Sequence, residues 1–398
     1  MIDLQRKEDC CGCGACYDAC THKAIEWTVD EEGFSYPSVN RDLCIDCGLC
    51  NKVCPIINKD TIAFRNKENQ PIVYGVHHKD ENVQFSSTSG GAFWGLAEDY
   101  VKQGGYVSGA VFTEHYHVSH FITNNLDELK RIKGSKYCQS DCRGIYNKIW
   151  KLLIAGEKVM ATGLPCQIAA LHQFLHKDYD NLITVDLICH SVSSPMIFQK
   201  YIEGLESRYG SAISNYHPKN KEYGGWHRYA FKATFENGKV YYKNGNEDRY
   251  TKLFVGSDNI CTRYSCFECP FKNVPQPSDI TIGDFWGIEL IDPAFDSPKG
   301  ISKIVLNSPK GKEYFESLDS FVVKQYSVEE SIYNNPPSHT MLETAKRPEE
   351  NKRRQFFKDI QIMPFDQCVV KYYPEDKLLP IKRRVYSILR FVRNAFRK

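Results

Sequence analysis

Hydrophobic positions in the middle of the chain follow two alternating spacings. Five apolar residues fall at i, i+3, i+4, i+7 and i+8, which places them on one face of a predicted helix: Phe93, Leu96, Ala97, Tyr100 and Val101. Ser89 is expected to cap the start of this helix, and Gly104 to end it. The apolar run at 106–112 then predicts a strand.

The alternation of strands and helices continues to residue 209. The pattern predicts further strands at 158–162 and 182–188, and further helices at 143–155, after Pro165 and at 195–209. Such an order is typical of an α/β layer with a largely parallel sheet. Asn237-Gly238 between two alternating segments predicts a hairpin over 229–242, so we expect a mixed sheet.

The first 58 residues do not show this alternation of strand and helix patterns. They hold two dense cysteine runs and a short segment at 25–39, in which Asp30 to Gly33 is expected to form a hairpin turn. The expected organisation is a small ferredoxin-like domain at 1–58 and a polar linker at 59–70. A large mixed-sheet α/β domain at 71–345 and a C-terminal extension at 346–398 would follow, making the chain α/β in class, or α+β overall.

Composition narrows the class of protein. Hydrophobic residues make up 42% of the 398 residues and aromatic residues 13%, enough for a sizeable core and too many for a disordered chain. No apolar run approaches the length of a membrane span, and the first seven residues do not resemble a secretory signal. The 17 cysteines are odd in number and clustered, which favours metal ligation in a reducing compartment over disulfides. We therefore expect a cytoplasmic protein.

The C-terminal segment at 381–398 carries basic residues, no acidic residue, and apolar residues at helical spacing. It is expected to be an amphipathic helix that lies on an anionic membrane, at the inner membrane face, or docks on this chain or a partner. The remainder of the chain is mildly acidic, which argues against nucleic-acid binding.

Two cysteine runs predict two [4Fe–4S] clusters. In each run a C-x2-C-x2-C loop supplies three thiolates to one cluster, and the fourth cysteine reaches the other cluster. The predicted first set is Cys10, Cys13, Cys16 and Cys54, and the predicted second set is Cys44, Cys47, Cys50 and Cys20. Two zinc sites are the alternative, but zinc sites usually show two separated C-x2-C pairs.

Neighbouring residues support a cluster-binding loop. Gly12, Gly14 and Gly48 suit a backbone that folds closely around sulfide and offers N–H groups to it. Cys11 duplicates Cys10 and is an alternative ligand, although Cys10 restores the x2 spacing.

The large domain resembles the family of coenzyme F420 hydrogenase and dehydrogenase beta subunits, which includes plant 7-hydroxymethyl chlorophyll a reductase. Seven segments carry the resemblance in the family's order: Ser87 to Gly91, Lys136 to Ser140, Gly163 to Gln167, Asp186 to His190, Cys266 to Pro270, Asp279 to Gly287, and Gly300 to Ser302. The resemblance implies a flavoprotein that binds FAD, often with an extra cluster in the large domain.

Several polar residues of these segments are candidates for holding FAD. Thr88, Ser89, Gly90 and Gly91 lead directly into a helix, whose N-terminal N–H groups suit a phosphate. An ordinary helix cap is the alternative. The other candidates offer a cation, hydrogen-bond donors or a place at a strand end: Lys136, Gln139, Ser140, Pro165 and Gln167.

Four further cysteines are candidates for a third [4Fe–4S] cluster. Cys166 and Cys189 each follow a predicted parallel strand and should emerge at the same sheet edge, while Cys266 and Cys269 form a chelating C-x2-C pair. One alternative replaces Cys166 or Cys189 by Cys261 or another residue, and a second is that these cysteines are buried structural thiols.

Several histidines and an aspartate near these segments remain open to interpretation. His190 is a candidate proton donor near the flavin, or a histidine that is simply hydrogen-bonded in place. His115, His117 and His120 alternate as a partly exposed strand face would. Asp284 is interpreted as a structural cap or turn residue, and the alternative is that it faces the cofactor.

Taken together, the cysteine runs and the family resemblance imply an iron–sulfur flavoprotein oxidoreductase. It would exchange electrons with ferredoxin or a partner subunit, and reduce or oxidise an organic substrate or a deazaflavin such as coenzyme F420. The alternative is a non-catalytic electron-transfer subunit of a larger complex.

Overall fold

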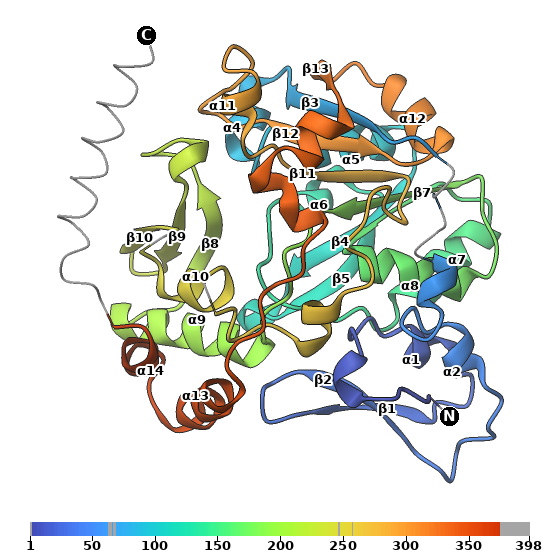
Figure 1. Cartoon of the computed structure of the whole chain (residues 1–398), viewed down its shortest axis with the longest axis vertical. Coiled ribbons are helices and arrows are strands. Elements are labelled where there is room, and N and C mark those ends of the chain that lie inside the picture. The colour runs from blue at the N-terminus through green and yellow to red at the C-terminus, as the bar shows by residue number, and fades with distance from the viewer. Residues whose placement is uncertain (1, 63–65, 67–68, 246, 257, 375–398) are drawn as a thin grey trace.

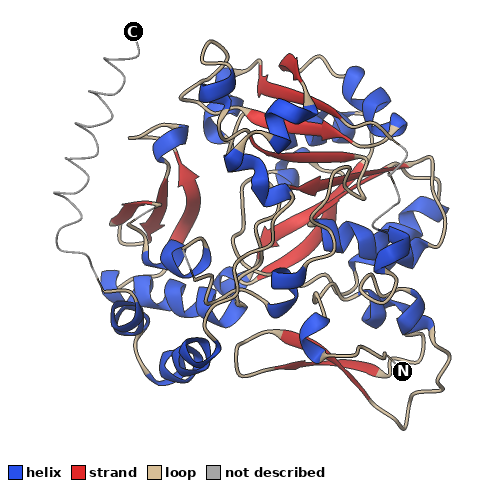
Figure 2. Ribbon diagram, in the orientation of Figure 1, coloured by secondary structure: helices blue, strands red, loops and turns tan. Residues whose placement is uncertain are grey.

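An eight-stranded mixed sheet forms the centre of the large domain (Figures 1 and 2). The computed structural model describes residues 2–62, 66, 69–245, 247–256 and 258–374. The strand order is β13-β3-β12-β11-β7-β6-β4-β5. The four central strands run parallel, and antiparallel strands flank them at both edges. The strands are β3 (Ile72–His78), β4 (Tyr106–Phe112), β5 (Val118–Thr123), β6 (Val159–Gly163), β7 (Leu182–Leu187), β11 (Ile280–Asp284), β12 (Ser302–Leu306) and β13 (Phe321–Tyr326). The predicted mixed α/β sheet is confirmed.

Helices cover both faces of this sheet because successive strand residues point to opposite sides. Met160 of β6 packs in the core formed with α5 (Ala92–Lys102) and α12 (Pro309–Glu316). Its neighbours Val159 and Ala161 pack on the other side, against α7 (Ile145–Ile154) and α8 (Pro165–Leu175). The shorter helices of this domain are α4 (Glu81–Ser86), α6 (Leu126–Leu129) and α11 (Ile288–Ile291).

A separate three-stranded antiparallel sheet stands beside the main sheet (Figure 1). It consists of β8 (Ile213–Asn220), β9 (Ala230–Phe235) and β10 (Val240–Asn244). Its core is shared with α9 (Pro195–Tyr209), α10 (Arg249–Phe254), α13 (Glu350–Ile362) and α14 (Phe365–Tyr372). The predicted hairpin is therefore confirmed as β9 and β10, but it lies outside the main sheet. The mixed character of that sheet comes from its edge strands instead.

The N-terminal segment folds around the predicted hairpin of β1 (Ile25–Val29) and β2 (Ser35–Val39). Two short helices, α1 (Ala15–Ala19) and α2 (Leu49–Lys52), lie next to each other and carry Cys16 and Cys50. Residues 2–58 are called the N-terminal module, and in Figure 1 this module lies below the main sheet, beside α7 and α8.

A side chain of the N-terminal module caps a helix of the large domain and so attaches the two parts to each other. The carboxylate of Asp18 accepts hydrogen bonds from the N–H groups of Gly144 at 2.6 Å, Tyr146 at 3.0 Å and Asn147 at 3.2 Å, at the start of α7. A carboxylate at a helix N-terminus satisfies N–H groups that have no partner within the helix. Asp18 thus fixes the orientation of α1 relative to α7.

Within the predicted linker the structure contains α3 (Lys59–Ile62) and a buried Asn66. The Asn66 amide donates hydrogen bonds to the carbonyl oxygens of Gln276 at 2.6 Å and Ser278 at 3.0 Å. In the predicted extension, α13 and α14 pack into the core of the second sheet, and α14 contacts α9. The predicted basic helix at 381–398 lies outside the described residues.

Most predicted elements of the large domain are confirmed with small changes at their ends. The helix predicted from Phe93 begins after Gly91, whose φ of +96° forms the cap, so Ser89 is not its cap as predicted. Its end at Gly104 is confirmed. The predicted strand face of His115, His117 and His120 is wrong, because residues 114–116 form a helical turn and only His120 lies in β5. Among the described residues, no helix is both long enough and apolar enough to cross a membrane.

Candidate functional site

The predicted first cysteine set lies where the N-terminal module meets α7 and α8. Cys13 and Cys16 are buried, and Cys16 interacts electrostatically with Cys10 and Cys54. The N–H of Gly12 donates to the sulfur of Cys10 at 3.4 Å, in a turn that Gly12 permits with its φ of +70°. Thiols that receive backbone N–H donors at close range suit an iron–sulfur cluster.

The predicted second set lies nearer the surface. Cys50 is buried and Cys20 and Cys44 are half-buried, whereas Cys47 is exposed. The sulfur of Cys20 accepts a hydrogen bond from the N–H of Ala24 at 3.2 Å. A cluster held by this set would therefore be the one closer to solvent.

Four cysteines from three separate segments line one pocket in the large domain: Cys166, Cys189, Cys266 and Cys269. Cys166 follows β6 and Cys189 follows β7, two parallel strands whose carboxyl ends meet at one edge of the sheet. The other two come from η4 (Tyr264–Glu268) and the residue after it. The sequence-predicted third set is thus brought together by the topology of the sheet.

Burial raises the pKa of these thiols, and a nearby positive charge lowers it. Desolvation raises the pKa of both Cys189 and Cys266 to about 12, and the nearby Lys272 partly opposes this rise. The Lys272 ammonium donates hydrogen bonds to the carbonyl oxygens of Cys189, His190 and Thr340. Four converging thiols that need positive charge to ionise fit a cationic iron cluster.

Cys261 lies elsewhere. It is fully buried in the core of the second sheet, where its thiol donates to the carbonyl oxygen of Leu253 at 3.2 Å, and it does not line the cysteine pocket. The alternative in which Cys261 replaces Cys166 or Cys189 therefore has no support in its position. Within the described residues, no group of three or more His, Cys, Asp or Glu side chains is arranged to hold a single metal ion.

The candidate flavin residues lie in two different places. Gln139, Pro165 and Gln167 line the cysteine pocket, and Gln167 donates to the buried Ser140 hydroxyl at 3.0 Å. Thr88 to Gly91 pack instead against the segment at 300–302. The predicted residues therefore do not form one continuous surface.

The segment before α5 is closely packed. A Cβ at Gly90 would lie 2.5 Å from the carbonyl oxygen of Val76 and 2.6 Å from the N–H nitrogen of Ser302, so only glycine fits there. The Ser302 hydroxyl accepts hydrogen bonds from the N–H groups of Gly90 at 2.8 Å and Ala92 at 3.4 Å. Two of the donors that we expected to bind a phosphate are thus already engaged.

Lys136 is also engaged within its own loop. Its ammonium donates hydrogen bonds to the carbonyl oxygens of residues 131–134 at 2.8 to 3.1 Å, and burial lowers its pKa to about 7. The position of Lys136 therefore stabilises this loop and leaves no free ammonium directed at a ligand.

His190 lines the cysteine pocket, and its Nε2 lies 2.8 Å from the side-chain oxygen of Asn259. Burial lowers its pKa, which favours the neutral ring. Asp284 is the last residue of β11, not a cap or turn residue, and its carboxylate accepts hydrogen bonds from Lys219 and from the Trp226 indole at 3.0 Å.

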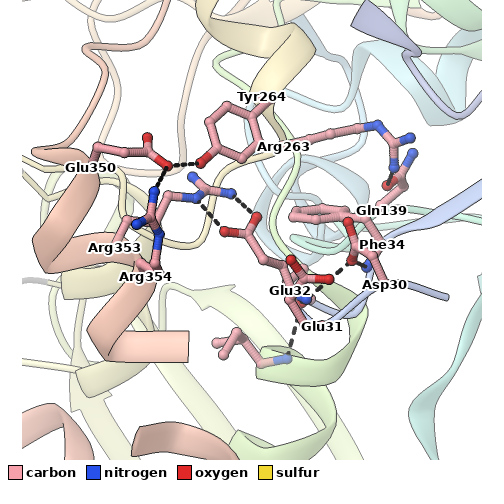
Figure 3. Close-up of polar contacts among 12 residues, drawn as sticks. Asp30, Glu31, Glu32, Phe34, Gln139, Arg263, Tyr264, Glu350, Arg353 and Arg354 are labelled. Carbon is pink, nitrogen blue, oxygen red and sulfur yellow. Dashed lines mark hydrogen bonds and ion pairs between the residues drawn. The ribbon is translucent and has the colours of Figure 1, made fainter. Parts of the chain in front are cut away.

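Two residues of the site occupy positions that the sequence did not predict. Cys11 is the fifth cysteine to line the pocket, whereas its spacing suggested only an alternative ligand of the first set. Arg263 is fully buried, and its guanidinium donates to the carbonyl oxygen of Cys10 in the N-terminal module and to Gln139 in the large domain; Figure 3 shows the second of these contacts. A contact between domains leaves no periodic pattern, so sequence spacing could not reveal either position.

Comparison with known proteins identifies both parts of the chain. Residues 9–56 match the family model of the 4Fe-4S dicluster domain. An uncharacterized ferredoxin from Methanocaldococcus jannaschii is 41% identical over 49 residues, which make up 12% of this chain and 62% of that ferredoxin. These matches confirm the predicted two-cluster ferredoxin-type segment.

The chain is similar in fold to one chain in the structure of the F420-reducing [NiFe] hydrogenase complex from Methanosarcina barkeri. The sequence identity is 16% and the TM-score 0.43, over 74% of this chain and 89% of that chain. Residues 156–329 match the family model that describes the C terminus of the coenzyme F420 hydrogenase/dehydrogenase beta subunit. The chain thus joins a 4Fe–4S dicluster domain at residues 9–56 to a segment at 156–329 that matches the coenzyme F420 hydrogenase/dehydrogenase beta-subunit family.

Proposed function

We propose that this chain is an iron–sulfur flavoprotein oxidoreductase. It passes electrons between a ferredoxin-like donor or a partner subunit, three [4Fe–4S] clusters and FAD, and it reduces or oxidises an organic substrate or a deazaflavin coenzyme. The observation that carries the proposal is the pocket lined by Cys166, Cys189, Cys266 and Cys269, directly next to the N-terminal module. FAD would supply the change from one-electron to two-electron chemistry.

Each group of residues has a distinct part in this proposal. The exposed side of the second set, around Cys47, suits electron exchange with a protein donor. Gln139, Pro165 and Gln167 would hold the flavin near the third set, since they line the same pocket. Thr88, Ser89 and Gly91 remain candidates for more distant parts of FAD, with fewer free N–H groups than the sequence predicted. His190 lines the same pocket and would donate a proton beside the flavin only after the ring, which burial keeps neutral, has itself taken up a proton.

A second candidate function is supported by the name of the matching family, which describes a subunit. In that case the chain would gate electrons inside a larger complex without turning over a small molecule itself. The two functions differ in what the isolated chain can do.

The deciding experiment is anaerobic reduction of the isolated, flavin-containing chain by reduced ferredoxin, with coenzyme F420 as the acceptor. An oxidoreductase should bleach the deazaflavin at a rate proportional to chain concentration. A chain that takes up electrons into its clusters and flavin but reduces neither this acceptor nor other small molecules would support the electron-transfer subunit. A chain whose purified form contains no flavin would contradict both.

A further inference from the structure

Cys11 lies between two of the cysteine sets. Its thiol interacts with the thiols of both Cys13 and Cys166. Cys13 belongs to the predicted first set and Cys166 to the predicted third set, and Cys11 also lines the pocket of the third set. Its position therefore connects the N-terminal module with the large domain.

Cys10 and Cys11 are neighbours in sequence, and of the two only Cys11 lines the pocket of the large domain. Cys10 receives the N–H of Gly12 on its sulfur and interacts electrostatically with Cys16, as a member of the first set would. Cys11 is directed to the pocket of the large domain. Cys11 also lies near Cys13 and Cys54 of the first set, so it is the C-x2-C spacing that assigns the ligand role to Cys10 and leaves Cys11 for another role.

Two side chains of the large domain hold this turn in place. Arg263 donates from Nε to the carbonyl oxygen of Cys10 at 2.7 Å, and Gln139 donates from Nε2 to the carbonyl oxygen of Cys11 at 3.2 Å. Arg263 also donates to the side-chain oxygen of Gln139 at 2.9 Å, a contact visible in Figure 3. The three bonds form a closed network, so the Cys10–Cys11 backbone has little freedom to move.

The turn leaves no room for a larger residue at position 12. A Cβ at Gly12 would lie 2.3 Å from Nε2 of Gln139 and 3.1 Å from the guanidinium carbon of Arg263. Gly12 also has a φ of +70°, which other residues rarely adopt. The approach of Cys11 to Cys166 thus depends on a backbone that only glycine permits.

We propose that Cys11 is not a cluster ligand but the contact through which electrons move between the first cluster and the third. One electron leaves one cluster and enters the other, while no bond of Cys11 forms or breaks. Arg263 and Gln139 are positioning residues that keep Cys11 against both Cys13 and Cys166. The inference rests on the proposed function, because it needs a cluster in the third set.

The test uses the full chain, purified without oxygen, with the substitutions Cys11→Ala and Cys11→Ser. Serine keeps a polar hydrogen at this position, whereas alanine removes the contact. Cys368→Ala is the matched control, because Cys368 is a buried cysteine in α14, away from the pocket. Each protein is mixed with reduced ferredoxin and frozen at set times. The electron paramagnetic resonance signal of the third cluster is then followed, and iron content is measured separately.

We expect C11A to keep its iron while the third cluster becomes reduced about tenfold or more slowly, the effect typical of losing a group next to a metal site. C11S should lie closer to the unmodified chain, and C368A should match it. Full iron with an unchanged rate in C11A would overturn the inference. Loss of about four irons in C11A would also overturn it, because Cys11 would then be a ligand. If the unmodified chain itself lacks a third cluster, the proposed function has failed first.

Discussion

Arg353 on α13 and Glu32 in the N-terminal hairpin turn form a buried ion pair, although 321 residues separate them in sequence. The Nε–Oε1 distance is 2.8 Å, and the Arg353 side chain is completely shielded from solvent (Figure 3). Together with the Asp18 cap and the Arg263 network, this pair helps to attach the N-terminal module to the rest of the chain.

The first prediction concerns this attachment. Arg353→Met leaves the Glu32 carboxylate buried without its cation, and breaking a buried pair in this way costs about 3–5 kcal/mol. We expect a lower midpoint of anaerobic thermal unfolding and faster proteolysis in the hairpin. Arg354→Met is the control, because Arg354 is exposed and lies 3.9 Å from Glu350. Equal effects of the two substitutions would show that the ion pair does not hold the module.

A second prediction concerns the charge of Arg263. A buried cation near Cys10 and Cys11 stabilises the extra electron of a reduced cluster. Arg263→Gln should therefore shift the reduction potential of the first cluster to a more negative value, measured by a potentiometric titration with electron paramagnetic resonance. Arg263→Lys, which keeps the charge but not the three-way hydrogen bonding, should shift it less. Arg347→Gln removes an exposed cation paired with Glu268 and should have little effect; an equal shift there would refute the explanation.

The third prediction separates Cys266 from Cys261. Cys266→Ser should lower the iron content by about four atoms per chain, the content of one cubane. Cys261→Ser should leave the iron content unchanged, since Cys261 donates to a carbonyl oxygen in the core and does not reach the pocket. Iron analysis with circular dichroism, to check folding, distinguishes the two. Loss of iron from the Cys261 variant alone would reassign the third set.

The fourth prediction is a pH dependence of stability at Asp186 in β7. Burial raises its pKa from 3.8 to about 7, while Thr281 donates a hydrogen bond at 2.6 Å that opposes the rise. Between these two values the folded chain holds a proton that the unfolded chain releases, so stability falls as pH rises through this window. Asp186→Asn cannot ionise, and its advantage over the unmodified chain should be greater at pH 8 than at pH 5.5, by about 1–2 kcal/mol.

Unfolding midpoints at the two pH values give this comparison. Asp180→Asn serves as the control, because Asp180 lies on the loop before β7, outside the buried strand. A stabilisation from the Asp186 substitution that is the same at both pH values would mean that Asp186 does not carry the titration.

The periodic parts of the chain could be predicted, while the contacts between distant segments could not. Strand β4 and helix α9 match their expected ranges because their apolar spacing is regular. The hairpin of β9 and β10 was found through Asn237-Gly238, but local turn chemistry does not say which sheet a hairpin joins.

In the candidate site, too, local patterns could be predicted and contacts between distant segments could not. Cysteine spacing pointed to the N-terminal clusters, and strand ends pointed to Cys166 and Cys189. Lys136 was expected to face a ligand, but it is held by carbonyl oxygens of its own loop, a partnership that charge alone cannot reveal. Arg263 and Cys11 make contacts between the N-terminal module and the large domain. Such contacts produce no periodic spacing of residues, so the sequence does not predict them.

The central claim is that one chain holds three iron–sulfur clusters and a flavin, and the most direct measurement is the metal and flavin content of anaerobically purified protein. Eight N-terminal and four further cysteines predict about twelve iron atoms and a matching amount of acid-labile sulfide, with one FAD and no zinc. About eight iron atoms or fewer, or zinc in their place, would contradict the claim of three clusters.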